Sequence, residues 1–393
     1  MVTQSTSDPQ PARLYVDPII DDRSTRIIVC CGAGGVGKTT TAAALALRAA
    51  ERGRTVVVLT IDPARRLAQS MGLTALDNTP RRVGGIDDRA GGQLHAMMLD
   101  MKRTFDDIVV AHADEQRAQQ ILENPFYQAL SSSFAGTQEY MAMEKLGQLR
   151  ATGEWDLIVV DTPPSRSALD FLDAPERLGR FLDGRFIRVL MAPARAGGRT
   201  GMKIMSAGFG VFTGVLNKVV GGQLLKDISL FVNGLDSMFG GFRERADATY
   251  RLLKAPGTAF VVVAAPEKDA LREAAYFVER LDGEGMPLAG LVLNRMHAGA
   301  PIALGLERAT AAAESLEEAG HHAVAAATLR LHADRVALTA RERRLRERFT
   351  SAHPRVAVAE VTAFAGDVHD LDGLRDVGHD LADPGTPDLA RPA

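Results

Sequence analysis

The stretch CCGAGGVGKTT, residues 30–40, decides the fold of this 393-residue chain. Within it, Gly32, Gly37, Lys38 and Thr39 match the pattern G-x-x-x-x-G-K-[ST]. An apolar run precedes the pattern and an alanine-rich helical stretch follows it. This strand–loop–helix context gives the pattern its predictive value. It predicts a loop whose backbone N–H groups hold phosphate oxygens at the N-terminus of a helix.

Each part of this loop has an expected role. The residues whose backbone is expected to line the phosphates are Gly34, Gly35, Val36 and Gly37. We expect Lys38 to reach the β- and γ-phosphates of a nucleotide and the Thr39 hydroxyl to ligate Mg²⁺. The alternative is a glycine-rich turn that binds no ligand, which the flanking strand and helix disfavour.

Short apolar runs rich in β-branched residues recur along the chain and predict strands. They lie at 26–31, 55–62, 94–100, 157–161, 260–266, 288–294 and 355–361. Most are continuous rather than alternating, as is typical of strands buried on both faces of a parallel sheet. Helical stretches at 39–54, 268–281 and 303–349 separate several of them. The alternation predicts an α/β fold with a doubly wound, mostly parallel sheet of the P-loop NTPase type.

Two long segments interrupt the alternation. Residues 102–150 and 174–250 have helical spacing and no strong strand run, so we expect a helical subdomain inserted into the sheet domain. Residues 1–24 are polar and are expected to form a flexible lead-in, followed by one P-loop domain over 25–382. The Pro-rich segment 383–393 is predicted to be a disordered tail.

Composition narrows the environment and the partners. A formal charge of −3 gives no field that would hold a nucleic acid, so we expect no nucleic-acid partner. The only cysteines, Cys30 and Cys31, are adjacent, which excludes a disulfide framework and a C-x-x-C zinc half-site. The uncharged run 204–217 is shorter than the roughly 20 residues that a membrane-spanning helix needs. These features, with an N-terminal stretch that lacks an apolar signal segment, predict a cytoplasmic protein.

Polar residues end three of the predicted strands. Asp161 follows LIVV and is a candidate to hold Mg²⁺, or else caps a loop. Asp62 follows TVVVLTI and is our candidate to orient the attacking water in phosphoryl transfer, although Asp-Pro turns at strand ends are common. Asn294 ends LAGLVLN, where an amide can bind an adenine edge or cap a turn. The absence of an N-K-x-D motif after it favours ATP over GTP.

With these motifs in view, the sequence resembles the ArsA/GET group of P-loop ATPases. This group includes the arsenite-pump ATPase and the ATPase that targets tail-anchored membrane proteins. The matching stretches are GAGGVGKTT (32–40), LTIDPARRL (59–67), DTPPSRSALDFL (161–172), VVVAAPEKDALREA (261–274) and LVLNR (291–295). The sequence also resembles an actinobacterial subgroup of Get-like ATPases, and this resemblance implies a pair of unequal subunits.

The resemblance implies a role for each matched residue. Lys38, Thr39 and Thr40 would bind phosphates and Mg²⁺, Asp62 would activate water, Asp161 would support the metal, and Asn294 would read adenine. ATP-driven closing of a dimer would reshape a helical surface that binds a hydrophobic client or a membrane protein. Three features depart from the family pattern. Ala33 replaces the signature lysine, no C-x-x-C follows Asn294, and the adenine loop reads VTAFAGDV (361–368).

The alanine at position 33 indicates which kind of subunit the partner should be. In the family, the signature lysine reaches across the dimer to the other subunit's nucleotide, much as an arginine finger acts in trans. Losing such a charge from both sites would cost on the order of 10³-fold in rate. The sequence therefore predicts a heterodimer with a homologous ATPase subunit that carries the lysine.

Two alternatives to an active ATPase stay open. Ala33 also suits a regulatory subunit that binds ATP and stabilises a lysine-bearing partner but hydrolyses little. An oxyanion-pump ATPase ranks lower because two adjacent cysteines cannot form a three-thiol site.

Methionine is concentrated in one part of the chain. Flexible thioethers suit a groove for apolar helices, and ordinary core filling is the competing interpretation. Nine of the 13 methionines fall within residues 97–238: Met97, Met98, Met101, Met141, Met143, Met191, Met202, Met205 and Met238.

Overall fold

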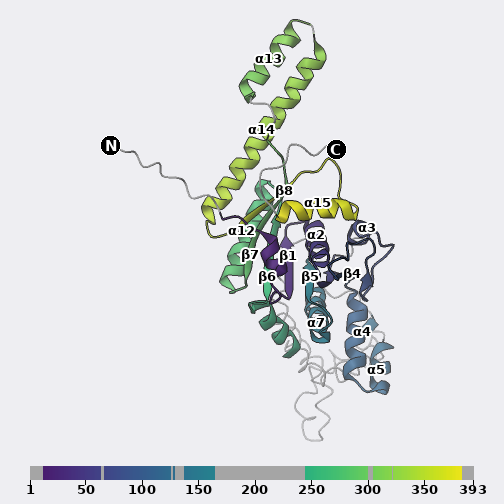
Figure 1. Cartoon of the computed structure of the whole chain (residues 1–393). Helices are drawn as coiled ribbons and strands as arrows, with labels where there is room; N and C mark the ends of the chain where they lie inside the picture. Colours follow the sequence, from purple (N-terminus) through teal and green to yellow (C-terminus); the bar gives the residue numbers. More distant parts are fainter. Residues whose placement is uncertain are drawn as a thin grey trace, which may run out of the picture. The chain divides into compact units, whose positions relative to one another are not determined.

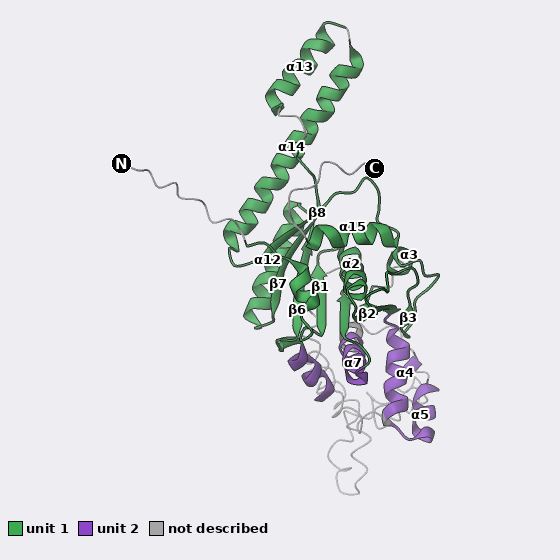
Figure 2. Cartoon of the chain, viewed as in Figure 1, with its two compact units in different colours: residues 1–97, 154–166, 253–393 green, residues 98–153, 167–252 purple. Residues whose placement is uncertain are grey.

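The computed structural model describes residues 12–62, 66–124, 127–128, 137–163, 244–299, 304–320 and 322–382. The chain divides into two compact units, shown in Figure 2. The first comprises residues 1–97, 154–166 and 253–393, and the second comprises residues 98–153 and 167–252. The expected helical segment 174–250 lies mostly outside the described residues, and the expected tail 383–393 lies wholly outside them.

An eight-stranded sheet forms the centre of the first unit, in the order β3-β4-β2-β5-β1-β6-β7-β8. The strands are β1 (Ile27–Gly32), β2 (Thr55–Thr60), β3 (Arg81–Arg82), β4 (Gln93–Met98), β5 (Leu157–Asp161), β6 (Thr258–Ala264), β7 (Leu288–Met296) and β8 (Val358–Thr362). The pairs from β2 through β8 in this order are parallel, and β3 pairs with β4 antiparallel. The predicted doubly wound, mostly parallel sheet is confirmed.

The glycine-rich loop leaves the middle of this sheet. Every residue of β1 is buried, because β5 flanks it on one side and β6 on the other. The register places Cys30 opposite Asp161 on β5 and opposite Val261 on β6. The carboxyl ends of these parallel strands therefore meet at one edge, where ligands bind in open α/β sheets.

Helices alternate with the strands along the chain (Figure 1). They are α1 (Val16–Asp21), α2 (Lys38–Glu51), α3 (Arg66–Ser70), α4 (Met101–His112), α5 (Glu115–Leu122), α7 (Thr137–Thr152), α12 (Lys268–Gly283), α13 (Leu306–Glu318), α14 (Ala323–Ala352) and α15 (Leu371–Ala382). The alanine-rich α2 packs against β1, β2, β5 and α15, and α12 packs against β1, β6 and β7. None of the helices in the described part of the chain is long and apolar enough to cross a membrane.

The N-terminal segment departs from the expectation of a flexible lead-in over 1–24. Residues 12–14 pair with the start of β8, and α1 follows with Val16 and Ile20 buried. The side chain of Arg54 anchors this segment by hydrogen bonds. It is buried and donates to the carbonyl oxygens of Ile20, Asp22, Thr25 and Asp156. The expectation was wrong for residues 12–24, since two apolar residues four apart in a six-residue helix give too weak a pattern.

The stretch expected to be helical over 303–349 is a hairpin of two antiparallel helices, α13 and α14 (Figure 1). Its interface is made of small side chains: Ala309 and Ala313 on α13 and Ala326 and Ala333 on α14 are buried. Small residues let the two helix backbones approach closely, as seen generally at tight helix–helix crossings. The second half of α14 returns to the sheet, where Phe349 is buried.

The second unit is helical in most of its described parts, which include α4, α5, α7 and residues 244–252. There Met141 and Met143 on α7 are buried, as is Met97 on β4 of the first unit. Core filling accounts for these three methionines. The positions of Met191, Met202, Met205 and Met238, which the groove hypothesis also uses, lie outside the described residues.

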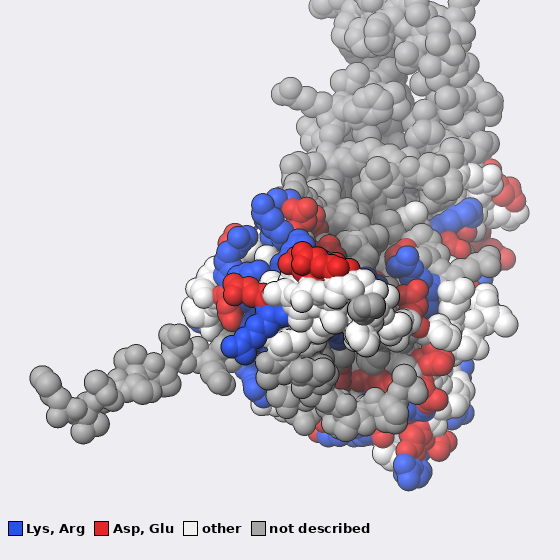
Figure 3. Space-filling model, turned by 90° about the horizontal axis from the view of Figure 1, so that it is seen from above, with Lys and Arg blue, Asp and Glu red and all other residues white. Residues whose placement is uncertain are grey.

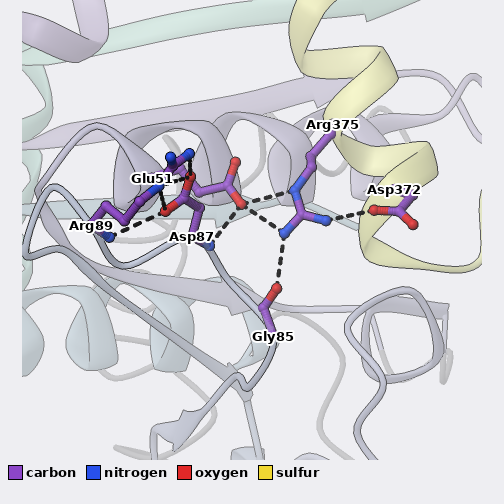
Figure 4. A network of polar contacts seen from close by, with 6 residues as sticks. All are labelled: Glu51, Gly85, Asp87, Arg89, Asp372 and Arg375. Atoms are coloured by element: carbon purple, nitrogen blue, oxygen red, sulfur yellow. Dashed lines mark hydrogen bonds and ion pairs between the residues drawn. The ribbon is translucent and has the colours of Figure 1, made fainter.

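A polar network joins α15 to α2 and to the loop before β4 (Figure 4). Arg375 on α15 donates to Glu51 on α2 at 2.9 Å, to Asp372 at 2.6 Å and to the carbonyl oxygen of Gly85 at 2.8 Å. The same Glu51 carboxylate accepts from the backbone N–H of Asp87. The side chain of Asp87 accepts from Arg89, which lowers its pKa to about 2. Elsewhere on the surface, basic and acidic side chains lie interspersed on the face shown in Figure 3.

Candidate nucleotide site

The glycine-rich loop has the backbone shape that the sequence pattern predicts. Gly35 and Gly37 have φ angles of 76° and 95°, in the left-handed region that favours glycine. A Cβ on Gly32 would lie 2.1 Å from the carbonyl oxygen of Val263, so β6 passes too close for any side chain there. Helix α2 starts at Lys38, directly after the loop. Its first N–H groups have no partner within the helix and can bind an anion.

Lys38 folds back over the loop that precedes it. Its side chain is 6% exposed and its Nζ donates to the carbonyl oxygen of Ala33 at 2.7 Å. Burial lowers the pKa of Lys38, while the nearby carboxylates of Asp161 and Asp62 act in the opposite direction. The ammonium group is thus held where added negative charge would stabilise it.

Asp161 lies beside the loop at the end of β5, and the fold surrounds one of its two oxygens with donors. Its Oδ2 accepts from the hydroxyl of Thr39 at 2.7 Å and from that of Thr60 at 2.9 Å. Its Oδ1 is buried and has no hydrogen-bond partner among the described residues. Burial raises the pKa of Asp161 to about 6, against the opposing effects of the two hydroxyls and of Lys38.

The side chains at this position fit a magnesium ion. Mg²⁺ prefers oxygen ligands and is held in nucleotide sites by one or two protein oxygens together with phosphates and waters. A hydroxyl and an unpartnered carboxylate oxygen meet that description, whereas a cluster of three or more His, Cys, Asp or Glu side chains is absent from the described ranges. Thr39 and Asp161 could therefore hold the ion between them.

Asp62 lies just beyond β2, and its backbone N–H donates to Thr60 Oγ1 at 3.2 Å. It is close enough to Lys38 and Asp161 to affect the pKa of each, so the two candidate acids belong to one charged cluster. Sequence reasoning missed Thr60, which connects them. A hydroxyl two residues before the strand-end acid, in T-I-D, is the signal that could have found it.

Asn294 comes to the loop from β7. Its Nδ2 donates to the carbonyl oxygen of Val36 at 2.8 Å. A Cβ on Gly37 would lie 2.0 Å from the same Nδ2, so the amide lies directly against the loop. Thr40, in the first turn of α2, is half-buried and near the same loop. Of the segment expected to sense the γ-phosphate, Thr162 donates to the carbonyl oxygen of Cys30, while residues 164–167 lie outside the described ranges.

Comparison with known proteins shows the family of this chain. The family model described as "Anion-transporting ATPase" matches residues 25–303. The chain belongs to the anion-transporting ATPase family. The chain is 31% identical over 180 residues to ATPase GET3 of Malassezia globosa. This aligned stretch covers 46% of the chain and 51% of that protein. It is also 30% identical over 178 residues to ATPase get3 of Schizosaccharomyces pombe. That aligned stretch covers 44% of the chain and 50% of that protein.

A longer match joins the chain to ATPase get3 of Pyrenophora tritici-repentis, with 24% identity over 281 residues, 71% of the chain and 76% of that protein. In the two more similar pairs, the chain spans about half the length of the relatives it matches. The resemblance to the ArsA/GET group is therefore confirmed at the level of the family.

At position 33, where the resemblance implies a lysine, the chain has an alanine. Ala33 is 8% exposed, and its carbonyl oxygen is the acceptor for Lys38. The two cysteines of this anion-transporting ATPase homologue are also buried, on β1. Burial raises the pKa of Cys31 to about 12, and that of Cys30 also rises well above its ordinary value. Both groups therefore stay as neutral thiols at physiological pH.

Proposed function

We propose that this chain binds Mg²⁺ and ATP at the loop of residues 32–40 and hydrolyses ATP as one subunit of a dimer. The observation that carries the proposal is the convergence of three side chains from two elements. Lys38 and Thr39 at the start of α2 meet Asp161 at the end of β5, and Asp161 Oδ1 is buried without a partner in the described chain. A bound metal ion would give that oxygen its missing partner.

Each residue has a distinct part in the proposed reaction. The backbone N–H groups of the loop and Lys38 bind the β- and γ-phosphates, and Thr39 and Asp161 hold Mg²⁺. The ion would neutralise charge that develops on the phosphate oxygens. Asp62 orients the attacking water, and Asn294 fixes the loop and contacts the adenine base. Positioning and electrostatic stabilisation supply most of the catalysis in phosphoryl transfer.

Ala33 makes the proposed dimer unequal. At this position the chain has a methyl group, whereas Lys38, Thr39 and Asp161, to which we assign phosphate and metal binding, lie together beside the loop. A homologous subunit that carries lysine here would supply the missing charge in trans. The complete site would then be the one in this chain, and the partner's own site would lack the lysine.

Turnover tests the proposal directly. The chain is purified alone and together with a lysine-bearing homologue, and steady-state ATP hydrolysis is measured with Mg²⁺. We expect the pair to exceed the lone chain by about 10³-fold, the contribution of a charge supplied in trans. Copurification of a second ATPase of similar size from the native source would support the pairing. Full turnover by the chain alone would contradict it.

A second candidate function is a regulatory subunit that binds ATP with little hydrolysis, and Ala33 is the observation that favours it. Single-turnover hydrolysis by the pair, with Asp62→Asn in this chain, separates the two candidates. An active site here predicts a loss of the single-turnover phase in the variant. A regulatory subunit predicts no change, because the partner would do the hydrolysis.

The client of the proposed ATPase would be a hydrophobic segment or a membrane protein, as the resemblance to the GET group implies. Transport of an oxyanion through thiol ligands has less support, since the chain's two cysteines are buried on β1 as neutral thiols. A pull-down with a membrane-protein segment in the presence and absence of ATP would test the client. Nucleotide-independent binding would argue against coupling to hydrolysis.

A further inference from the structure

The second half of α14 is attached to the sheet by one face of the helix. Glu342, Arg346 and Phe349 lie at spacings of four and three residues and therefore on the same side. Phe349 is buried, and Arg346 Nη1 pairs with Glu360 on β8 at 2.6 Å. Glu342 is 4% exposed, which is unusual for a carboxylate in a helix otherwise rich in exposed arginine. Its burial needs a compensating partner.

Among the described residues, the partner of Glu342 is His297, directly after β7. Its Oε2 accepts from the backbone N–H of His297 at 2.9 Å, and its Oε1 lies 2.7 Å from Nδ1 of the same histidine. Both carboxylate oxygens are thus used on one residue. The contact fixes the backbone position of His297 as well as the direction of its ring.

His297 is three residues from Asn294, and the backbone between them is irregular. The register between β7 and β8 shifts between Leu293 and Met296. Arg295, within this shift, has a φ of 63°, a conformation that is uncommon for residues other than glycine. Asn294 lies within the same shift, and its side chain donates to the carbonyl oxygen of Val36 in the loop. A strained bulge persists only when contacts on both sides hold it.

We propose that Glu342 and His297 are positioning residues for the nucleotide site, which hold the β7 bulge so that Asn294 stays against the loop. The inference rests on the proposed function, in which that loop binds ATP. It makes the α13–α14 hairpin part of the nucleotide site's support, because the carboxylate that fixes the bulge belongs to α14. The hydrogen bonds of Glu342 in the described chain go to His297, so it would act on the loop through His297 and Asn294.

The test measures ATP affinity, kinetics and amide hydrogen exchange in the full chain. In Glu342→Ala, we expect ATP affinity to fall about five-fold, equivalent to the loss of one hydrogen bond of about 1 kcal/mol. KM for ATP should rise to a similar extent and kcat should change little. In the nucleotide-free protein, amide exchange should quicken over residues 32–37 and 293–297.

A conservative variant distinguishes positioning from general packing. In Glu342→Gln, the side-chain carbonyl can still accept from the His297 backbone N–H, and the side-chain NH₂ can donate to Nδ1 of the other histidine tautomer. We expect this variant to restore affinity and exchange rates close to those of the unaltered protein.

Arg346→Met is the matched control, because it removes the other polar anchor on the same face of α14 and leaves β7 untouched. It should leave ATP affinity and exchange at 293–297 unchanged. An equal loss of affinity in Arg346→Met would overturn the proposal, since helix docking in general would then explain the effect.

A double variant completes the test. Because Glu342 acts through Asn294, adding Glu342→Ala to Asn294→Ala should cause no further loss of ATP affinity. Additive losses would overturn the proposal, as would unchanged exchange at 293–297 in Glu342→Ala. Failure of the unaltered chain to bind ATP would instead contradict the proposed function, and the exchange measurement would still decide whether Glu342 holds the bulge.

Discussion

Asp161 is buried with one oxygen bound by two hydroxyls and the other without a partner in the described chain. Its folded-state pKa of about 6 lies above the ordinary value of 3.8, so the ionised form disfavours the folded state. For this group, stability is greatest below about pH 4, falls as the pH rises toward 6, and is constant at higher pH. The ionised Asp161 carboxylate therefore destabilises the fold unless a bound cation neutralises it.

Replacing Asp161 with Asn should reverse the usual effect of a mutation in a buried site. At pH 8 without nucleotide, we expect the free energy of unfolding to rise by about 1–2 kcal/mol, less than the pKa shift alone implies because the new amide N–H lacks an acceptor. The gain should disappear near pH 4. Urea unfolding at the two pH values measures this.

The matched control is Asp156→Asn at the other end of β5, where the carboxylate is 38% exposed and pairs with Arg23. It should show no comparable gain. The Asp161→Asn variant should also lose the stabilisation that Mg²⁺ and ATP give the unaltered protein. A less stable Asp161→Asn protein at pH 8 would contradict this account of the site.

At the scale of elements, the sequence predicted those whose own pattern is strong. The continuous apolar runs predicted the central strands and placed Asp161 at the end of one of them, and the loop motif predicted the positions of Lys38 and Thr39. Elements stabilised mainly by distant residues were not predictable. Helix α1 depends on Arg54 and on α2, and Glu342 looks like one more charged residue of an exposed helix until its contact with His297 is seen.

The network of Figure 4 gives a prediction at this scale, because it joins three elements through one side chain. Replacing Arg375 with Met should lower the free energy of unfolding by about 1–2 kcal/mol, since Glu51 and the Gly85 carbonyl lose a charged donor. Chemical denaturation measures the loss. Arg355→Met is the control, because Arg355 is 90% exposed and its pair with Asp282 spans 3.7 Å. Equal losses in the two variants would show that the network adds nothing.

At the scale of the whole molecule, the proposed pairing of unequal subunits depends on the residue at position 33 of the loop. Ala33 is 8% exposed next to the exposed Gly34, so a longer side chain here would have to extend out of the loop. If the chain lacks only a charge supplied in trans, restoring that charge should let two copies complete each other's sites.

Ala33→Lys should therefore raise the ATP turnover of the lone chain, by about ten-fold or more given the size of such trans effects. It should also promote self-association with ATP, measured by sedimentation. Ala33→Met is the matched control, because it adds similar bulk without the charge, and it should do neither. Equal effects from both substitutions would show that side-chain size, rather than charge, controls the site.

The hydrogen bonds of Arg54 decide where a shortened form of this protein can begin. The family match begins at residue 25, and a fragment designed on that boundary would keep every nucleotide motif. It would also discard Ile20 and Asp22, which supply two of the four carbonyl acceptors of Arg54, a residue that is 1% exposed. A buried cation left short of acceptors is strongly destabilising. Expression of a short form should therefore begin at or before residue 12, with any affinity tag placed ahead of it.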